Sequence, residues 1–162
     1  MKTFITLFRG INVGGNNILP MKELRSSLES IGLHEVKTYI QSGNVVFQSE
    51  KSESQLSDLI FDAVKQNHNI EARVHVLELP GYERIVAANP YPDAIAEPKT
   101  LHIFFLTKPA TDPNIELLDS AKSPSEAYTI TDQAFYLHAP DGIGRSKLAT
   151  LVEKALRVPV LF

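Results

Sequence analysis

Residues 3–20 read TFITLFRGINVGGNNILP, and the pattern of this segment predicts how the first half of the chain folds. Over residues 3–9 the β-forming side chains alternate between two faces, with Phe4, Thr6 and Phe8 on one and Ile5 and Leu7 on the other, which predicts a strand that is mostly covered on both sides. The glycines and asparagines that follow do not suit a continued strand, and Pro20 fits the first turn of a helix. Apolar residues at spacings of three and four then predict a helix that starts near Met21 and ends at Gly32.

The following residues complete a unit of six elements. Two β-rich runs, 36–41 and 45–47, flank a short polar segment and predict an antiparallel hairpin. Ser52 and Gln55 have the spacing of a capping box, so we expect a helix to begin there. Residues 72–77 alternate as another strand. The resulting order, β-α-β-β-α-β, is that of a ferredoxin-like unit.

The second half of the chain repeats this order of elements without evident sequence identity to the first. We therefore expect an α+β fold, a duplicated ferredoxin-like (βαββαβ) plait whose antiparallel sheets carry helices on one face. The first half is expected at 1–78, a connecting helix and proline-rich linker at 79–98, and the second half at 99–162. Within the second half a helix is expected to start at Asp112-Pro113. The last strand contains Pro159, so it is expected to be short or missing and to lie at a sheet edge.

The composition is that of a folded globular protein. Of the 162 residues, 43% are hydrophobic and 22% are charged. The chain has no cysteine, which excludes disulfides, thiol catalysis and cysteine-ligated metal centres. The N-terminal strand reaches Arg9 before it could form the apolar core of a signal peptide, and no stretch is long enough to cross a bilayer. We therefore expect a cytoplasmic protein.

Charge and histidine spacing narrow the classes of function. The formal net charge is −3, whereas domains that grip phosphate backbones are usually basic, so nucleic acid is not the expected partner. The five histidines are scattered and none has the helical spacing of a metal-binding pair. No metal and no cofactor are expected.

The loop at 9–17 carries the first candidate site. Its glycines free the backbone from steric limits, and it leads toward a helix N-terminus, where unpaired N–H groups favour an anion. The candidate ligand-binding residues are Arg9, Gly10, Asn12, Gly14, Gly15, Asn16 and Lys22. The spacing does not match the glycine fingerprint of dinucleotide-binding proteins. A second interpretation stays open, in which the loop is only a tight connection rich in turn-forming residues.

A second loop of the same character enters the last helix of the chain. It combines flexible backbone, a hydroxyl and two cations in the candidate residues Gly144, Arg145, Ser146 and Lys147. Ala139 stands where a phosphate-binding P-loop needs glycine, and Arg145 replaces its lysine, so the loop is not a P-loop. The alternative is that Ser146 caps the helix beside solvated cations. If both loops bind the ligand, they should open on one shared pocket.

Three blocks of sequence resemble those of a known family. Arg9–Gly15, Tyr39–Phe47 and Gly142–Leu148 closely resemble signature blocks of the bacterial domain of unknown function 1697 family. The resemblance implies a small cytoplasmic bacterial protein with a duplicated ferredoxin-like plait, and it supplies no activity. Family members usually continue into a tail with an Arg-Asn-Trp-Asn pattern, whereas this chain has no tryptophan, so a site that needs such a tail is not expected here.

The middle block contributes the last candidate residues. It adds Gln41, Ser42 and Asn44 to the candidate ligand-binding set. Ser42 lacks the glycine pattern of a nucleophile elbow, so we interpret it as a turn residue and not as a nucleophile.

Three functions are compatible with these residues. The first is binding of a small anionic ligand, phosphate- or nucleotide-like, at the glycine- and arginine-bearing loops. The second is a protein-interaction module that uses a sheet edge. The third is a single-stranded nucleic-acid binder, because ferredoxin-like folds include RNA-binding domains, although the acidic composition opposes it. The sequence decides neither whether the chain is an enzyme nor whether it is a monomer or a weak dimer.

Overall fold

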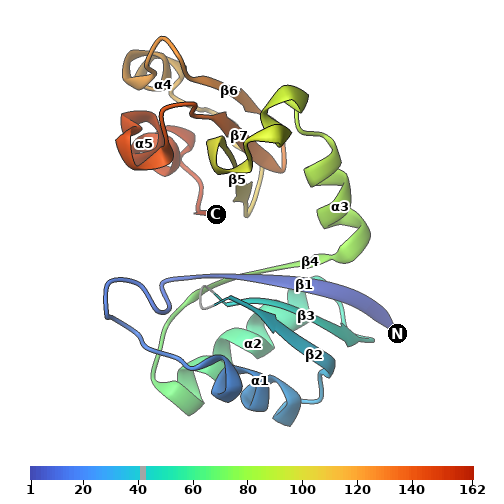
Figure 1. Ribbon diagram of the computed structural model, residues 1–162. Helices are drawn as coiled ribbons and strands as arrows, with labels where there is room; N and C mark the ends of the chain where they lie inside the picture. Colours follow the sequence, from blue (N-terminus) through green and yellow to red (C-terminus); the bar gives the residue numbers. More distant parts are fainter. Residues whose placement is uncertain (41–42) are drawn as a thin grey trace. The chain divides into compact units, whose positions relative to one another are not determined.

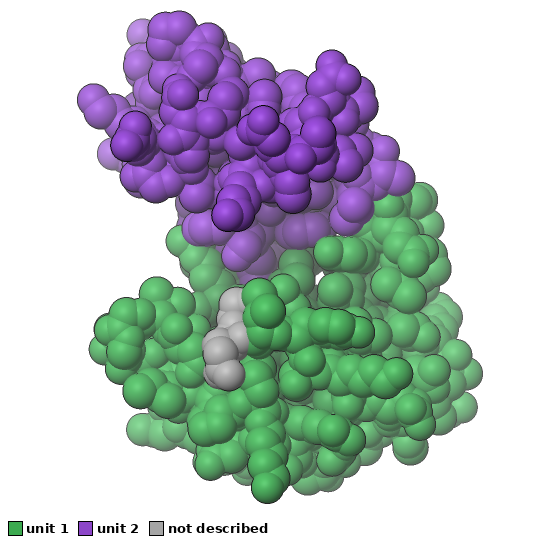
Figure 2. All heavy atoms as spheres, viewed as in Figure 1, with its two compact units in different colours: residues 1–84 green, residues 85–162 purple. Residues whose placement is uncertain are grey.

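The chain folds into two compact units. The computed structural model describes residues 1–40 and 43–162. The units are Met1–Arg84 and Ile85–Phe162 (Figure 2), and each has its own hydrophobic core. The boundary between them falls inside helix α3, Leu79–Ala87. The predicted α+β class is confirmed by an antiparallel four-stranded sheet in each unit.

The first unit is a sheet with two helices on one of its faces (Figure 1). Its elements are β1 Lys2–Arg9, α1 Met21–Ser30, β2 His34–Tyr39, β3 Asn44–Ser49, α2 Glu53–His68 and β4 Arg73–Glu78. The strand order is β2-β3-β1-β4, and every neighbouring pair is antiparallel. The βαββαβ order predicted from the sequence is therefore confirmed for this unit.

Strand β1 is the centre of this unit, and the alternation of its residues explains why. Phe4 and Phe8 enter the core beneath the helices, and the ring of Phe4 stacks on that of Phe47 with centroids 5.7 Å apart. Ile5 and Leu7 lie on the opposite face and are also buried. Both faces of the strand are covered, as its apolar alternation predicts.

Helix α1 begins and ends, and helix α2 begins, where the sequence predicts. Helix α1 starts directly after Pro20, and Gly32, with φ of +88°, follows its end. At the start of α2, the Ser52 hydroxyl accepts a hydrogen bond from the Gln55 backbone N–H, and the Gln55 side chain accepts one from the Ser52 backbone N–H. This is the expected capping box.

The second unit repeats the topology of the first. Its elements are the remainder of α3, η1 Pro92–Ala96, η2 Pro98–Thr100, β5 Leu101–Leu106, α4 Ile115–Ala121, β6 Ala127–Ile130, β7 Ala134–His138, η3 Ile143–Arg145, α5 Lys147–Leu156 and β8 Val160–Leu161. The strand order β6-β7-β5-β8 corresponds strand for strand to that of the first unit. Helices α4 and α5 cover one face of this sheet (Figure 1). The duplicated plait is confirmed.

Two details of the second unit follow from proline and asparagine chemistry. Strand β8 is present at the sheet edge, and Pro159 stands just before it, where no ladder hydrogen bond is lost. Helix α4 begins two residues later than the expected Asp112-Pro113 start. Its cap is Asn114, whose side chain accepts a hydrogen bond from the Leu117 backbone N–H at 3.0 Å, because an asparagine oxygen satisfies that donor directly.

Within residues 1–40 and 43–162, no helix combines the length and apolar character that crossing a membrane requires.

Candidate functional site

The loop between β1 and α1 is held together by hydrogen bonds between its own residues. The Asn12 side chain accepts a hydrogen bond from the Leu19 N–H at 2.7 Å and donates one to the Leu19 carbonyl at 2.9 Å. The Asn17 side chain donates to the Gly10 carbonyl at 2.8 Å. These bonds tie the start of the loop to its end, so the Asn12 side chain serves the loop itself.

The glycine pair at the loop tip forms a tight turn. Gly14 and Gly15 have φ of +58° and +76°, and the Asn16 N–H donates to the Val13 carbonyl at 2.9 Å. Two successive residues with positive φ are the signature of a type I′ turn. Turn geometry therefore accounts for Gly14, Gly15 and Asn16, as the second sequence interpretation proposed. Lys22 is exposed in the first turn of α1.

Gly43, the residue before β3, lies against this loop. A Cβ added to Gly43 would lie 2.5 Å from the Ile11 side chain and 3.3 Å from that of Phe8, and Gly43 has φ of +85°. The loop block and the hairpin block of the sequence therefore meet at one end of the first sheet. Asn44 begins β3 there, half-buried, whereas the candidates Gln41 and Ser42 lie outside the described residues.

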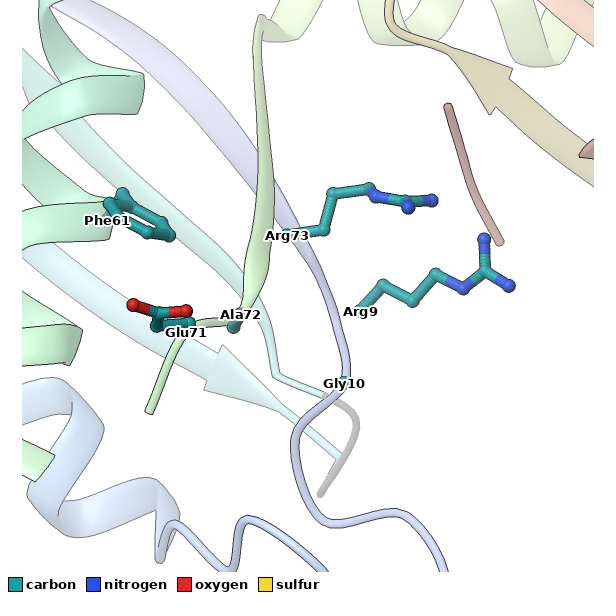
Figure 3. A pocket seen from close by; sticks show the side chains of 6 residues that line it. All are labelled: Arg9, Gly10, Phe61, Glu71, Ala72 and Arg73. Atoms are coloured by element: carbon teal, nitrogen blue, oxygen red, sulfur yellow. The ribbon is translucent and has the colours of Figure 1, made fainter. Parts of the chain in front are cut away.

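Two arginines lie side by side at this end of the sheet. Arg9 and Arg73 are directly opposed in the antiparallel pairing of β1 with β4, so their side chains leave the same face. Figure 3 shows both extending on one side, away from Phe61 and Glu71. An open pocket of about 560 Å³ is lined by Arg9, Gly10, Phe61, Glu71, Ala72 and Arg73. Both arginines also interact with other groups of the chain.

Among the described residues that line the pocket, two are arginines and one is a carboxylate. The one carboxylate of the pocket lining, Glu71, forms an ion pair with Lys65 at 2.9 Å. That contact raises the pKa of Lys65, through the hydrogen bond and then the charge of Glu71. On the face that carries Arg9 and Arg73, the residues of β1, β3 and β4 include His75 and no carboxylate. Burial lowers the pKa of His75, although the Glu53 carboxylate acts in the opposite direction.

The second candidate loop is built differently. Ser146 caps α5: its hydroxyl accepts a hydrogen bond from the Ala149 N–H at 3.0 Å and donates one to the Glu126 carboxylate at 2.5 Å. Glu126 is only 7% exposed, and it also accepts from the Ser123 N–H at 2.9 Å. The positive end of the helix therefore already has a carboxylate of the protein beside it, where an external anion would otherwise bind.

The pocket at this second loop is small and acidic. It measures about 230 Å³ and is lined by Ser123, Glu126, Ala139, Asp141, Gly142, Arg145 and Ser146. Glu126 and Asp141 contribute two negative charges and Arg145 one positive charge, so the lining carries a formal charge of −1. Gly144, Arg145 and Lys147 are exposed. The two candidate loops belong to different units, and the expected shared pocket stays a prediction.

Comparison with known proteins places the chain among related sequences. A family profile described as "Protein of unknown function (DUF1697)" matches residues 1–136. The chain belongs to the DUF1697 family. The resemblance inferred from the sequence blocks is thus confirmed, and the match covers the first two blocks, which meet at the loop end of the first sheet.

One solved structure illustrates the fold of this DUF1697 chain. This structure is that of "conserved bacterial protein SP0830 from Streptococcus pneumoniae", to which the chain is similar with a TM-score of 0.69 and 23% sequence identity. The similarity covers 98% of this chain and 91% of the other. At this identity the similarity establishes the fold alone. A search of curated proteins finds no match.

Three functional candidates on this DUF1697 chain were not anticipated from the sequence. Arg73 opens a strand that was predicted, and an antiparallel β1–β4 pair would have placed it beside Arg9. Tyr39 stands in the hairpin block, 55% exposed, at the end of β2. Glu126 carries no local signal, because its partner Ser146 is 20 residues further along the chain.

Among the residues that the structure describes, no group of three or more histidine, aspartate or glutamate side chains is arranged to hold a metal ion.

Proposed function

We propose that this protein binds a small phosphate-like anion at the loop end of its first sheet. The observation that supports the proposal most directly is the opposed pair Arg9 and Arg73, next to Gly10. Two adjacent guanidinium groups match the geometry of a phosphate or carboxylate, because each presents several N–H donors in a planar fork.

The charges of the pair favour an anion over a cation. Guanidinium groups stay protonated at physiological pH, so they attract an anion and repel a cation. Glu71 does not oppose this, because its charge is paired with Lys65. The proposal requires the two guanidinium groups to be adjacent, as the pairing of Arg9 with Arg73 implies.

The acidic second pocket is not part of this proposal. Glu126 occupies the N-terminus of α5, and the pocket lining there is negative overall. The proposed site therefore retains Arg9 and Gly10 of the sequence-predicted set and adds Arg73.

Thermal unfolding with pyrophosphate tests the proposal. A ligand at about ten times its dissociation constant stabilises by roughly 1.4 kcal/mol, which should raise the melting temperature of a small domain by several degrees. Arg9→Gln and Arg73→Gln should each abolish most of that shift. Arg25→Gln is the matched control, because Arg25 is an exposed arginine of the same unit that pairs with Glu29 at 2.9 Å. Absence of any shift in the wild type, or an equal shift in all three variants, would rule the proposal out.

A second candidate function is protein binding by the same end of the first unit. Val13, Ile18 and Ile40 are 64%, 69% and 71% exposed, and they belong to the two loops that meet at Gly43. Exposed apolar side chains that gather on adjoining loops are typical of interaction surfaces. Light scattering at increasing protein concentration tests self-association. A mass that stays monomeric in both wild type and Ile18→Asp would exclude a homodimer through this surface.

A further inference from the structure

We infer that the anion at Arg9 and Arg73 is the phosphate of a mononucleotide, whose base stacks on Tyr39. This inference rests on the proposed function and names the ligand class of the same site. It follows from the strand register, which places a cationic end and an exposed aromatic ring on one face of one sheet.

The register defines the positions of these groups. Tyr39 is opposed to Asn44 in the pair of β2 with β3, so both side chains leave the same face. Val46, two residues from Asn44 on that face, is opposed to Ile5, which shares a face of β1 with Arg9. The cationic pair and Tyr39 are thus separated by β3 and lie at the same end of the sheet. From strand spacing and rise, the Cα atoms of Tyr39 and Arg9 are about 12 Å apart.

On the sheet face that carries Arg9 and Tyr39, the middle of β1 is buried, so we expect a ligand to bind at the loop end. Ile5, Leu7 and Leu77 on the same face are buried. Tyr39 is 55% exposed and Asn44 is half-buried. A ligand that contacts the arginine pair can therefore extend toward β2, where it meets the Asn44 amide and then the Tyr39 ring.

The chemistry of these groups suits the parts of a nucleotide. Guanidinium groups bind phosphate, and an exposed tyrosine ring stacks on any base because every base has a π-face. An amide side chain between them can bind the edge of a base or the hydroxyl groups of a ribose. Inorganic phosphate would use the arginines alone and would leave Tyr39 and Asn44 without a role.

The size of the cationic site favours a mononucleotide over a long nucleic acid. The site has two arginines, and the whole chain has a formal net charge of −3. Proteins that hold a polynucleotide track many phosphates with many cations, and their overall charge is usually positive. Two guanidinium groups match one phosphate group.

Titration calorimetry on the full chain tests the inference with four probes. These are adenosine 5′-monophosphate, cytidine 5′-monophosphate, adenosine and inorganic phosphate. Since base stacking on an aromatic ring strengthens binding by roughly 5- to 150-fold, at least one of the two monophosphates should bind more tightly than inorganic phosphate by a factor in that range. Adenosine alone should bind more weakly than its monophosphate.

Variants at Tyr39 separate stacking from general effects. Tyr39→Ala should reduce the affinity for the monophosphate to that for inorganic phosphate, whereas Tyr39→Phe, which keeps the ring, should retain most of it. Ile95→Ala is the control, because Ile95 is 64% exposed and lies in the second unit. The affinity for inorganic phosphate should be unchanged in all three variants.

The outcomes distinguish this inference from the proposed function. If inorganic phosphate binds in an Arg9-dependent manner and neither monophosphate binds more tightly, the nucleotide inference is overturned and anion binding stands. If Tyr39→Ala leaves the monophosphate affinity unchanged, the stacking assignment is overturned as well. If none of the phosphorylated probes binds, both proposals fail. A ten-nucleotide single strand that binds far more tightly than either monophosphate, with an affinity that falls steeply with salt, would overturn the choice of a mononucleotide.

Discussion

Gly43 is the residue at which the two family blocks of the first unit touch. Its backbone has φ of +85°, a conformation that side chains with a Cβ adopt at a cost of about 1–2 kcal/mol. A methyl group there would also collide with Ile11, which is a buried residue of the loop. Local conformation and packing therefore both disfavour a larger residue at this position.

We expect Gly43→Ala to destabilise the protein by about 2–4 kcal/mol, the sum of backbone strain and overpacking. Gly14→Ala is the matched control, because Gly14 also has positive φ but a Cβ there would meet nothing within 4 Å. It should cost only the strain, about 1–2 kcal/mol. Urea unfolding of the two variants checks the difference. Equal losses would show that the Ile11 contact does not constrain the hairpin.

His75 makes the stability of the protein depend on pH. Because burial lowers its pKa below the usual 6.5, the unfolded state binds a proton more readily than the folded state. This contribution to stability is therefore fully present above pH 6.5 and is lost as the pH falls below that value. His75→Gln cannot take up the proton, so its unfolding free energy should fall less between pH 7.5 and pH 5.5 than that of the wild type. Equal losses measured by urea unfolding would contradict the prediction.

At the scale of the element, the N-cap of helix α5 is buried, whereas the N-cap of helix α2 is exposed. Ser146 caps α5 and also satisfies Glu126, which is almost fully buried. Ser52 caps α2 at the surface, within its own capping box. Both serines are N-caps, but only Ser146 also donates a hydrogen bond to a buried carboxylate.

We expect Ser146→Ala to cost about 2–4 kcal/mol, because it removes a cap and leaves a buried carboxylate short of a hydrogen bond. Ser52→Ala should cost about 1 kcal/mol, the usual loss for an exposed cap. Chemical unfolding of both variants measures the difference. Glu126→Gln combined with Ser146→Ala should recover part of the loss, since no charge then stays buried. A loss for Ser146→Ala no larger than that for Ser52→Ala would refute the role of Glu126.

At the scale of the molecule, each unit has a separate aromatic centre. In the first, Phe4 stacks on Phe47, and in the second the rings of Phe104 and Phe135 meet edge to face with centroids 5.6 Å apart. All four rings are buried. Each unit contains the whole of one hydrophobic cluster.

We expect Phe47→Ala and Phe135→Ala each to destabilise by about 3–5 kcal/mol, with the effect concentrated in the unit that carries the change. Hydrogen exchange followed by mass spectrometry locates it. Phe47→Ala should speed exchange within Met1–Arg84, and Phe135→Ala within Ile85–Phe162. Uniform acceleration along the chain after either change would show that the units unfold as one cooperative body.

Local patterns in the sequence determined most of the architecture. The apolar alternation of β1, the capping box of α2 and the glycine that follows α1 are each complete within a few residues, so periodicity and cap chemistry were enough to predict them. The duplicated order of elements followed from these local signals. Arg9 was also identified locally, as a cation at a strand end beside glycine.

Which of these residues lie together depends on long-range contacts in the folded chain. Arg73 lies opposite Arg9 because β1 and β4 pair in one register, and Glu126 reaches Ser146 because the second unit brings the turn before β6 to the start of its last helix. The roles of Gly14 and Gly15 as turn residues also depend on bonds that close the loop. Contacts of this kind join positions far apart along the chain, and a single sequence carries no periodic signal for them, since pairing register and packing are set by the whole fold.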